Sequence, residues 1–168
     1  MHSTQRAPGK KTETRSVIGR VKASYPRIRR ILVPLDFSGK SRQALRFAIP
    51  IAQKFGAKIF LLHVITPKAP SPAEGPAAAA NVKWDASRVE KRLEAMALGH
   101  VPPAARGPHV VRVGSPHEGI LNAAEKFDVD MIVLTTHGRT GLKRFFLGST
   151  AEQVMRHAQC PVLSVRRH

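Results

Sequence analysis

One segment of the chain combines glycines and hydroxyl side chains in a way that suits a phosphate ligand. It runs from Thr135 to Thr150, and its Gly138 and Gly148 lack the Cβ atoms that would keep a backbone away from phosphate. Ser149 and Thr150 open a predicted helix, whose N-terminal amides favour anions. A plain loop with turn glycines and a serine helix cap would show the same pattern. No Gly-Lys-Ser/Thr follows at the spacing of a Walker A motif, so a P-loop lysine is excluded.

Charged and titratable residues accompany this segment. Asp36 directly follows an apolar run, where a carboxylate could hold Mg²⁺ or a ribose hydroxyl, or cap the next helix. His137 has the pKa range of a general acid or base, but no positioned nucleophile or second carboxylate accompanies it, which favours packing within the loop. Arg139, Lys143 and Arg144 add positive charge beside the glycines.

Short apolar runs alternate along the chain with segments of helical periodicity. Such runs are typical of strands that are buried on both faces of a parallel sheet. The predicted strands are 31–35, 58–65, 109–113, 130–134 and 161–165. The predicted helices are 38–55, 82–98, 116–127 and 149–157. Ser38 and Ser149 are expected to cap two of these helices, and Gly56 and Gly99 to end two of them.

This alternation predicts an α/β fold with a doubly wound, five-stranded parallel sheet and helices on both faces. Ligands of such sheets bind beyond the carboxyl ends of the strands, where the strand order reverses. The residues after the first, second and fourth strands are therefore the candidates for a site. The proline-rich segment 67–81 is expected to be a loop or a mobile flap.

The composition is that of one ordinary globular domain. The chain has 168 residues, with 42% hydrophobic and 23% charged residues. A lone cysteine, Cys160, excludes an intrachain disulfide and is most simply a small buried hydrophobe. No stretch approaches the roughly 18 apolar residues of a membrane-spanning helix, and the N-terminus lacks a secretory signal pattern. We therefore expect a cytoplasmic protein.

The net charge of +17 is concentrated toward the start of the chain. We expect residues 1–28 to form a basic, disordered tail and residues 29–168 to form the domain. A basic arm can bind nucleic acid or an anionic surface through phosphate contacts, and a solvated extension is the simpler interpretation because no aromatic residues are interleaved. The histidines show no zinc-ligand spacing.

Several short motifs occur in an order that resembles the universal stress protein (UspA-like) family. They are Ile31–Ser38, Leu61–Val64, Gly114–Pro116, Asp130–Val133, Thr136–Gly141, Leu147–Thr150 and Cys160–Leu163. Each motif is weak alone, but the ordered set is specific and covers about Arg30 to Arg166. The resemblance implies a sheet in the order 3-2-1-4-5, of the adenine nucleotide alpha hydrolase-like type. It also implies adenine nucleotide binding, as in many members, and dimers that pair through the last strand, 161–166.

The resemblance also implies a set of nucleotide-binding residues. ATP-binding members carry Gly-x2-Gly-x9-Gly-Ser/Thr after the fourth strand. Gly138, Gly148 and Ser149 match this pattern, whereas Thr135 stands at the first glycine position and places a side chain where backbone would lie near the ligand. Asp36 matches the aspartate that contacts the nucleotide and could also hold Mg²⁺ through the phosphates. Val64 matches the residue whose backbone reads the adenine edge. The other implied site residues are Pro34, Leu35, Leu134, His137, Arg139 and Thr150.

By this resemblance the chain is a stress-response regulator or sensor that binds ATP with Mg²⁺. Any hydrolysis should be slow, because no catalytic base or arginine finger is evident. Two alternatives remain open. One is a nucleotide-independent interaction module of the same fold, in which Thr135 marks a lost site. The other is an adenine-nucleotide enzyme that performs adenylyl transfer or pyrophosphate cleavage.

Overall fold

The sheet predicted from the apolar runs is present, with its strands parallel and in the implied order. The computed structural model describes residues 27–67, 86–136 and 148–166. The five strands lie in the order β3-β2-β1-β4-β5. They are β1 (Arg30–Pro34), β2 (Lys58–Ile65), β3 (Arg106–Val113), β4 (Met131–Thr135) and β5 (Val162–Val165). The predicted fold class and the 3-2-1-4-5 order are therefore confirmed.

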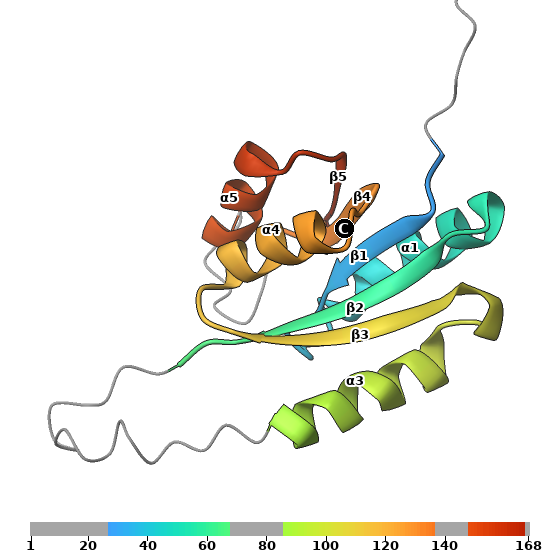
Figure 1. Ribbon diagram of the computed structural model, residues 1–168, viewed down its shortest axis with the longest axis horizontal. Helices are drawn as coiled ribbons and strands as arrows, with labels where there is room; N and C mark the ends of the chain where they lie inside the picture. Colours follow the sequence, from blue (N-terminus) through green and yellow to red (C-terminus); the bar gives the residue numbers. More distant parts are fainter. Residues whose placement is uncertain (1–26, 68–85, 137–147, 167–168) are drawn as a thin grey trace, which may run out of the picture.

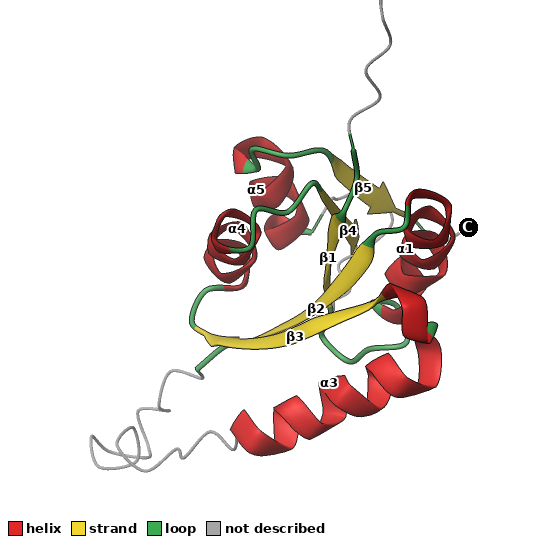
Figure 2. Ribbon diagram, turned by 45° about the vertical axis from the view of Figure 1, so that its right-hand side comes forward, coloured by secondary structure: helices red, strands yellow, loops and turns green. Residues whose placement is uncertain are grey.

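Helices cover both faces of this sheet. In the described part of the chain they are α1 (Arg42–Phe55), α3 (Ala86–His100), α4 (Pro116–Lys126) and α5 (Ser149–His157), with a short 3₁₀ helix, η1 (Pro103–Ala105). Helices α1 and α3 lie on one face, and α4 and α5 lie on the other (Figures 1 and 2). The molecule thus has three layers, with the sheet in the middle.

Strand side chains alternate between two separate hydrophobic cores, which explains why the strands read as continuous apolar runs. In β1, Ile31 and Val33 join the core beneath α1 and α3, whereas Leu32 joins the core beneath α4 and α5. In β4, Val133 belongs to the first core and Ile132 to the second. The three middle residues of each of these central strands are buried on one side of the sheet or the other.

Three predicted element boundaries are wrong, each for a local reason. Helix α1 begins at Arg42 rather than near Ser38, because residues 38–41 form a tight turn first. Helix α3 continues through Gly99 to His100, before Pro102 and Pro103. Strand β3 begins at Arg106 rather than His109, because Arg106 already pairs with Ile59 of β2. Gly99 does not end its helix, and the first apolar stretch of the third strand does not mark where that strand begins.

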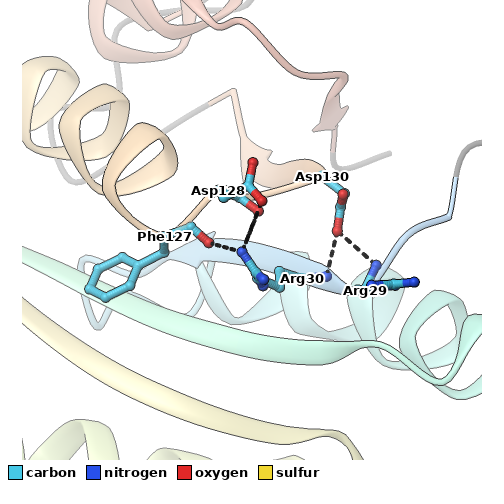
Figure 3. A network of polar contacts seen from close by, with 5 residues as sticks. All are labelled: Arg29, Arg30, Phe127, Asp128 and Asp130. Atoms are coloured by element: carbon cyan, nitrogen blue, oxygen red, sulfur yellow. Dashed lines mark hydrogen bonds and ion pairs between the residues drawn. The ribbon is translucent and has the colours of Figure 1, made fainter.

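A polar network joins the amino ends of β1 and β4 (Figure 3). Asp130 Oδ2 accepts hydrogen bonds from the backbone N–H groups of Arg29 and Arg30, both at 2.8 Å. The Arg30 guanidinium donates to the carbonyl oxygens of Phe127 and Asp128, at 2.8 and 3.1 Å. This network sets the register of the two central strands and fixes the point where the chain enters the sheet.

Candidate functional site

The switch point of the sheet lies between β1 and β4. After β1 the chain continues into α1 on one face, whereas the next described element after β4 is α5, on the opposite face. The two strands pair through Ile31 with Met131 and Leu32 with Ile132, near their amino ends. Doubly wound sheets bind ligands beyond the carboxyl ends of the strands at such a point. The residues that follow Leu32 and Ile132 along the chain are therefore the candidates for a ligand site.

Asp36 lies just past the end of β1, at the carboxyl edge of the sheet. Its Oδ1 accepts a hydrogen bond from the backbone N–H of Ser38 at 2.9 Å, which closes a tight turn. The side chain is half-buried, and its Oδ2 is shielded from solvent. The alternative prediction, that Asp36 caps the following helix, is wrong because α1 begins at Arg42.

Ser38 also belongs to this turn and does not cap α1. Its Oγ accepts a hydrogen bond from the backbone N–H of Ser41 at 3.1 Å, and Ser41 Oγ donates to Ser38 O at the same distance. Ser41 is the residue that precedes the helix. The turn thus uses two hydroxyls and one carboxylate to hold the loop between β1 and α1.

The backbone of Val64 faces the switch point. Leu35 N donates to Leu62 O at 2.7 Å, so the peptide groups of Leu62 point toward β1, and Gly114 N donates to Ile65 O, so those of Ile65 point toward β3. Because successive residues of a strand face opposite neighbours, Val64 presents its N–H and C=O on the β1 side. β1 ends at Pro34, which pairs with Leu62, so these groups lie beyond its end.

The side chain of Val64 points away from that edge, toward α4. A Cβ atom built on Gly119 of α4 would lie 2.8 Å from Val64 Cγ2. Glycine at this position therefore lets α4 pack closely over the end of β2. This packing holds Val64 while its peptide groups remain directed at the crossover.

Thr135 is the last residue of β4, and its backbone also faces β1. Thr136 N donates to Val165 O, so Thr136 faces β5 and Thr135 faces the opposite side. The side chain of Thr135 shares the α1 and α3 face with Val133 by strand alternation. Leu134 is 4% exposed and packs in the core beneath α4 and α5.

The remaining described residues of the predicted site differ in accessibility. Leu35 is 3% exposed and belongs to the core beneath α1 and α3, so its side chain serves packing. Pro34 and Thr150 are half-buried, and Ser149 is exposed at the start of α5. His137, Gly138 and Arg139 lie outside the described residues, as do most of the predicted tail and of the segment 67–81.

Glycine is required at position 148 because another part of the chain packs closely against this residue. It precedes α5 as its N-cap, so Ser149 is the first helical residue and not the cap that was predicted. Gly148 N donates to Thr136 O at 2.8 Å, and a Cβ atom at Gly148 would lie 2.9 Å from the same oxygen. This close approach brings the N-terminus of α5 to the end of β4.

Replacing Gly148 with alanine should lower the free energy of unfolding by about 1–3 kcal/mol, because the new methyl group collides with a backbone oxygen. Urea denaturation of both proteins measures the change. Gly99→Ala is the matched control, since Gly99 lies in a helix with open space around its Cβ position, and it should gain up to about 1 kcal/mol. Equal stabilisation by both substitutions would contradict the close contact.

Three residues that pack together beside Asp36, namely Phe37, His63 and Arg92, were not predicted from the sequence. The ring of Phe37 stacks on His63, with 4.4 Å between the ring centroids. The Arg92 guanidinium lies over the same ring, 4.2 Å from its centroid. Phe37 adjoins the carboxylate in sequence, but Arg92 comes from α3, and no local pattern connects it with the turn.

Other reactive groups in the described residues lie apart from this edge or have ordinary roles. Among residues 27–67, 86–136 and 148–166, no group of three or more His, Cys, Asp or Glu residues could hold a metal ion. Burial raises the pKa of the Cys160 thiol, and the charge of Asp130 raises it further, so the thiol is neutral at pH 7. Cys160 is partly buried rather than buried, and it packs against the core beneath α4 and α5.

Comparison with known proteins identifies the relatives of this chain. The universal stress protein family model matches residues 27–166. Universal stress protein MJ0531 of Methanocaldococcus jannaschii is 36% identical over 147 residues, which are 83% of this chain and 82% of that protein. A universal stress protein of Thermus aquaticus is 37% identical over 137 residues, 81% of this chain and 97% of the relative.

Solved structures give the same result. UspA from Lactobacillus plantarum superposes with a TM-score of 0.69 at 27% identity, over 83% of this chain and 99% of that one. A universal stress protein in complex with cAMP (TM-score 0.58, 19% identity, 83% and 98% covered) shares the fold. So does the Archaeoglobus fulgidus protein in complex with dAMP (0.56, 21%, 82% and 98%). None of the described helices combines the length and apolarity needed to cross a membrane. The match over nearly the whole described part, with the sheet order, shows that this chain belongs to the universal stress protein family.

Proposed function

We propose that this chain binds ATP, together with Mg²⁺, at the switch point between β1 and β4, and acts as a stress-response regulator or sensor. One observation carries the proposal. The peptide groups of Val64 in β2 and the carboxylate of Asp36, just after β1, lie at the same carboxyl edge on neighbouring strands. The backbone N–H and C=O of Val64 can together hydrogen-bond an adenine ring, and the carboxylate of Asp36 can accept hydrogen bonds from ribose hydroxyls.

The adenine ring fits the Val64 backbone by its hydrogen-bonding pattern. Adenine offers a donor, the N6 amino group, beside an acceptor, N1, and a strand residue offers C=O and N–H on the same side. Val64 presents this pair beyond the end of β1. Guanine places an acceptor where adenine has its donor, so the same contact disfavours GTP.

The ribose has a partner just after β1, and the phosphates have partners on the β4 side of the switch point. Asp36 can accept from ribose hydroxyls or act through Mg²⁺. The N-terminus of α5 lies against the end of β4 through Gly148, and its amides and positive dipole end favour phosphate. Ser149 and Thr150 supply hydroxyl groups in this first turn. The side chain of Thr135 lies on the α1 and α3 face by strand alternation, which leaves its backbone directed at the switch point.

Two relatives of the same fold support the ligand class. They were solved in complex with cAMP and with dAMP, both adenine nucleotides. Hydrolysis is proposed to be slow. The described residues that directly follow β1, β2 and β4 include one carboxylate, Asp36, and its Oδ1 is engaged with the Ser38 amide. Turnover, where present, would therefore lack a positioned base.

The protein is also proposed to form dimers through β5. This strand lies at one edge of the sheet, next to β4, and edge strands favour pairing with a second strand. A nucleotide bound beside α5 would then influence the dimer interface, because β5 is the next element after α5 in the chain.

Isothermal titration of the full-length chain with ATP and Mg²⁺ tests the proposal. Saturable binding is expected, with GTP weaker than ATP, and separate titrations with AMP and cAMP measure what the triphosphate adds. An absence of binding at millimolar ATP would overturn the nucleotide site and leave a nucleotide-independent interaction module.

A further inference from the structure

Phe37, beside the candidate carboxylate, has an unusual backbone conformation. Its φ angle is 60°, in the left-handed region that bulky side chains rarely adopt. Such a conformation persists only where the surrounding structure holds it, and it is common at ligand sites. The contacts that hold Phe37 are therefore informative.

Two side chains from different elements enclose the Phe37 ring. His63, from β2, stacks with an interplanar angle of 32° and a centroid separation of 4.4 Å. Arg92, from α3, places its guanidinium carbon 4.2 Å from the ring centroid, within the range of a cation–π contact. The ring is also packed against the core beneath α1 and α3.

The same contacts fix the backbone on both sides of Asp36. His63 Nδ1 donates a hydrogen bond to the carbonyl oxygen of Leu35 at 2.7 Å, just before Asp36. After Asp36, the stacked ring holds Phe37, and the Ser38 amide donates to Asp36 Oδ1. The segment 35–38 is thus held by hydrogen bonds at Leu35 and Ser38 and by the packing of the Phe37 ring, which restricts how the carboxylate of Asp36 can turn.

We propose that Arg92 and His63 are positioning residues that hold Phe37 in its left-handed conformation and so orient Asp36 at the switch point. This inference rests on the proposed nucleotide site and adds a route of regulation to it. Arg92 belongs to α3, a helix whose buried side chains are Leu93 and Ala97. Docking of α3 and binding of the nucleotide should therefore stabilise one another, since coupling between sites is reciprocal.

Arg92→Ala tests the inference, with Lys91→Ala as the matched control. Both side chains are exposed cations on α3, but Arg92 is the one over the ring. Arg92→Ala should weaken ATP binding by about two- to fivefold, the size of a lost cation–π contact at an exposed side chain. Lys91→Ala should change the affinity by less than about twofold, because an exposed charge is screened. Arg92→Lys should recover part of the loss, since an ammonium group still interacts with the ring.

Hydrogen exchange of the Ser38 amide, followed by NMR without ligand, provides a second readout. It should be faster in Arg92→Ala than in Lys91→Ala, since the turn around Asp36 loosens. Equal exchange and equal affinity in the two variants would overturn the inference. If the wild type binds no ATP, the nucleotide site fails, and the exchange comparison alone still decides whether Arg92 orients Asp36.

Discussion

Replacing Asp36 with asparagine should weaken the binding of ATP with Mg²⁺ by about 10- to 100-fold, the loss expected for hydrogen bonds to a charged group. Asparagine has the same shape and keeps an oxygen that can accept the Ser38 amide, which Asp36 Oδ1 holds at 2.9 Å. The turn should therefore survive while the negative charge is lost. Titration calorimetry measures the affinity, and thermal denaturation checks that the fold is unchanged.

The sign of this effect depends on two opposing terms. A carboxylate repels the phosphates, and over roughly 10 Å in water this repulsion is about 0.4 kcal/mol for each unit charge, or about 0.8 kcal/mol for the two net charges of ATP with Mg²⁺. A hydrogen bond to a charged group contributes about 1.5–3 kcal/mol, so the attractive contact should dominate. Tighter binding by the Asp36→Asn variant would show that the carboxylate faces phosphate and makes no ribose or Mg²⁺ contact.

Asp128→Asn is the matched control for this charge change. It removes the same charge from a side chain that is 94% exposed, at the amino end of the sheet. Its effect on ATP affinity should be less than about twofold, because a distant exposed charge is screened. Repeating the Asp36→Asn titration with EDTA separates the two roles, since a ribose contact survives metal removal and a contact through Mg²⁺ does not.

The parts of the site that could be predicted from sequence are those fixed by the strands. Apolar runs buried on both faces locate the strands, and the carboxyl ends then place Asp36 and Val64 at one edge. The strand order came from the family resemblance, because periodicity does not say which strands are neighbours. Once that order is known, the switch point between β1 and β4 follows.

The parts that could not be predicted depend on contacts between distant segments. Gly148 suggested close approach of phosphate, but in the structure its missing Cβ makes room for the Thr136 carbonyl. Glycine indicates that something comes close, and sequence alone does not say what. Arg92 over Phe37 has no local signal either, since helical spacing places Arg92 on an exposed face and only the packing of α3 brings it to the ring.

Replacing Asp130 with alanine should have the largest effect on stability among the polar substitutions considered for this chain. One oxygen, Oδ2, accepts the backbone amides of Arg29 and Arg30, each at 2.8 Å (Figure 3). Hydrogen bonds to a carboxylate contribute about 1.5–3 kcal/mol each, and partial exposure reduces this, so a loss of about 2–4 kcal/mol is expected. For a chain of this size, that corresponds to a fall in Tm of roughly 5–15 °C.

The neighbouring acid separates backbone anchoring from simple ion pairing. Asp128 pairs with the Arg30 guanidinium at 3.1 Å but is almost fully exposed, so Asp128→Asn should lower stability by less than about 1 kcal/mol. Asparagine is also well suited to position 128, where φ is 47°. Asp130→Asn should fall between the two, because the amide oxygen can still accept both N–H groups without the charge. Urea denaturation of the three variants gives this order, and equal losses for Asp130→Ala and Asp128→Asn would show that the network at the amino end does not anchor β1.

Since this network lies at the opposite end of β1 from Asp36, the folded Asp130→Ala protein should bind ATP with an affinity within about twofold of the wild type, as expected for sites that do not share contacts.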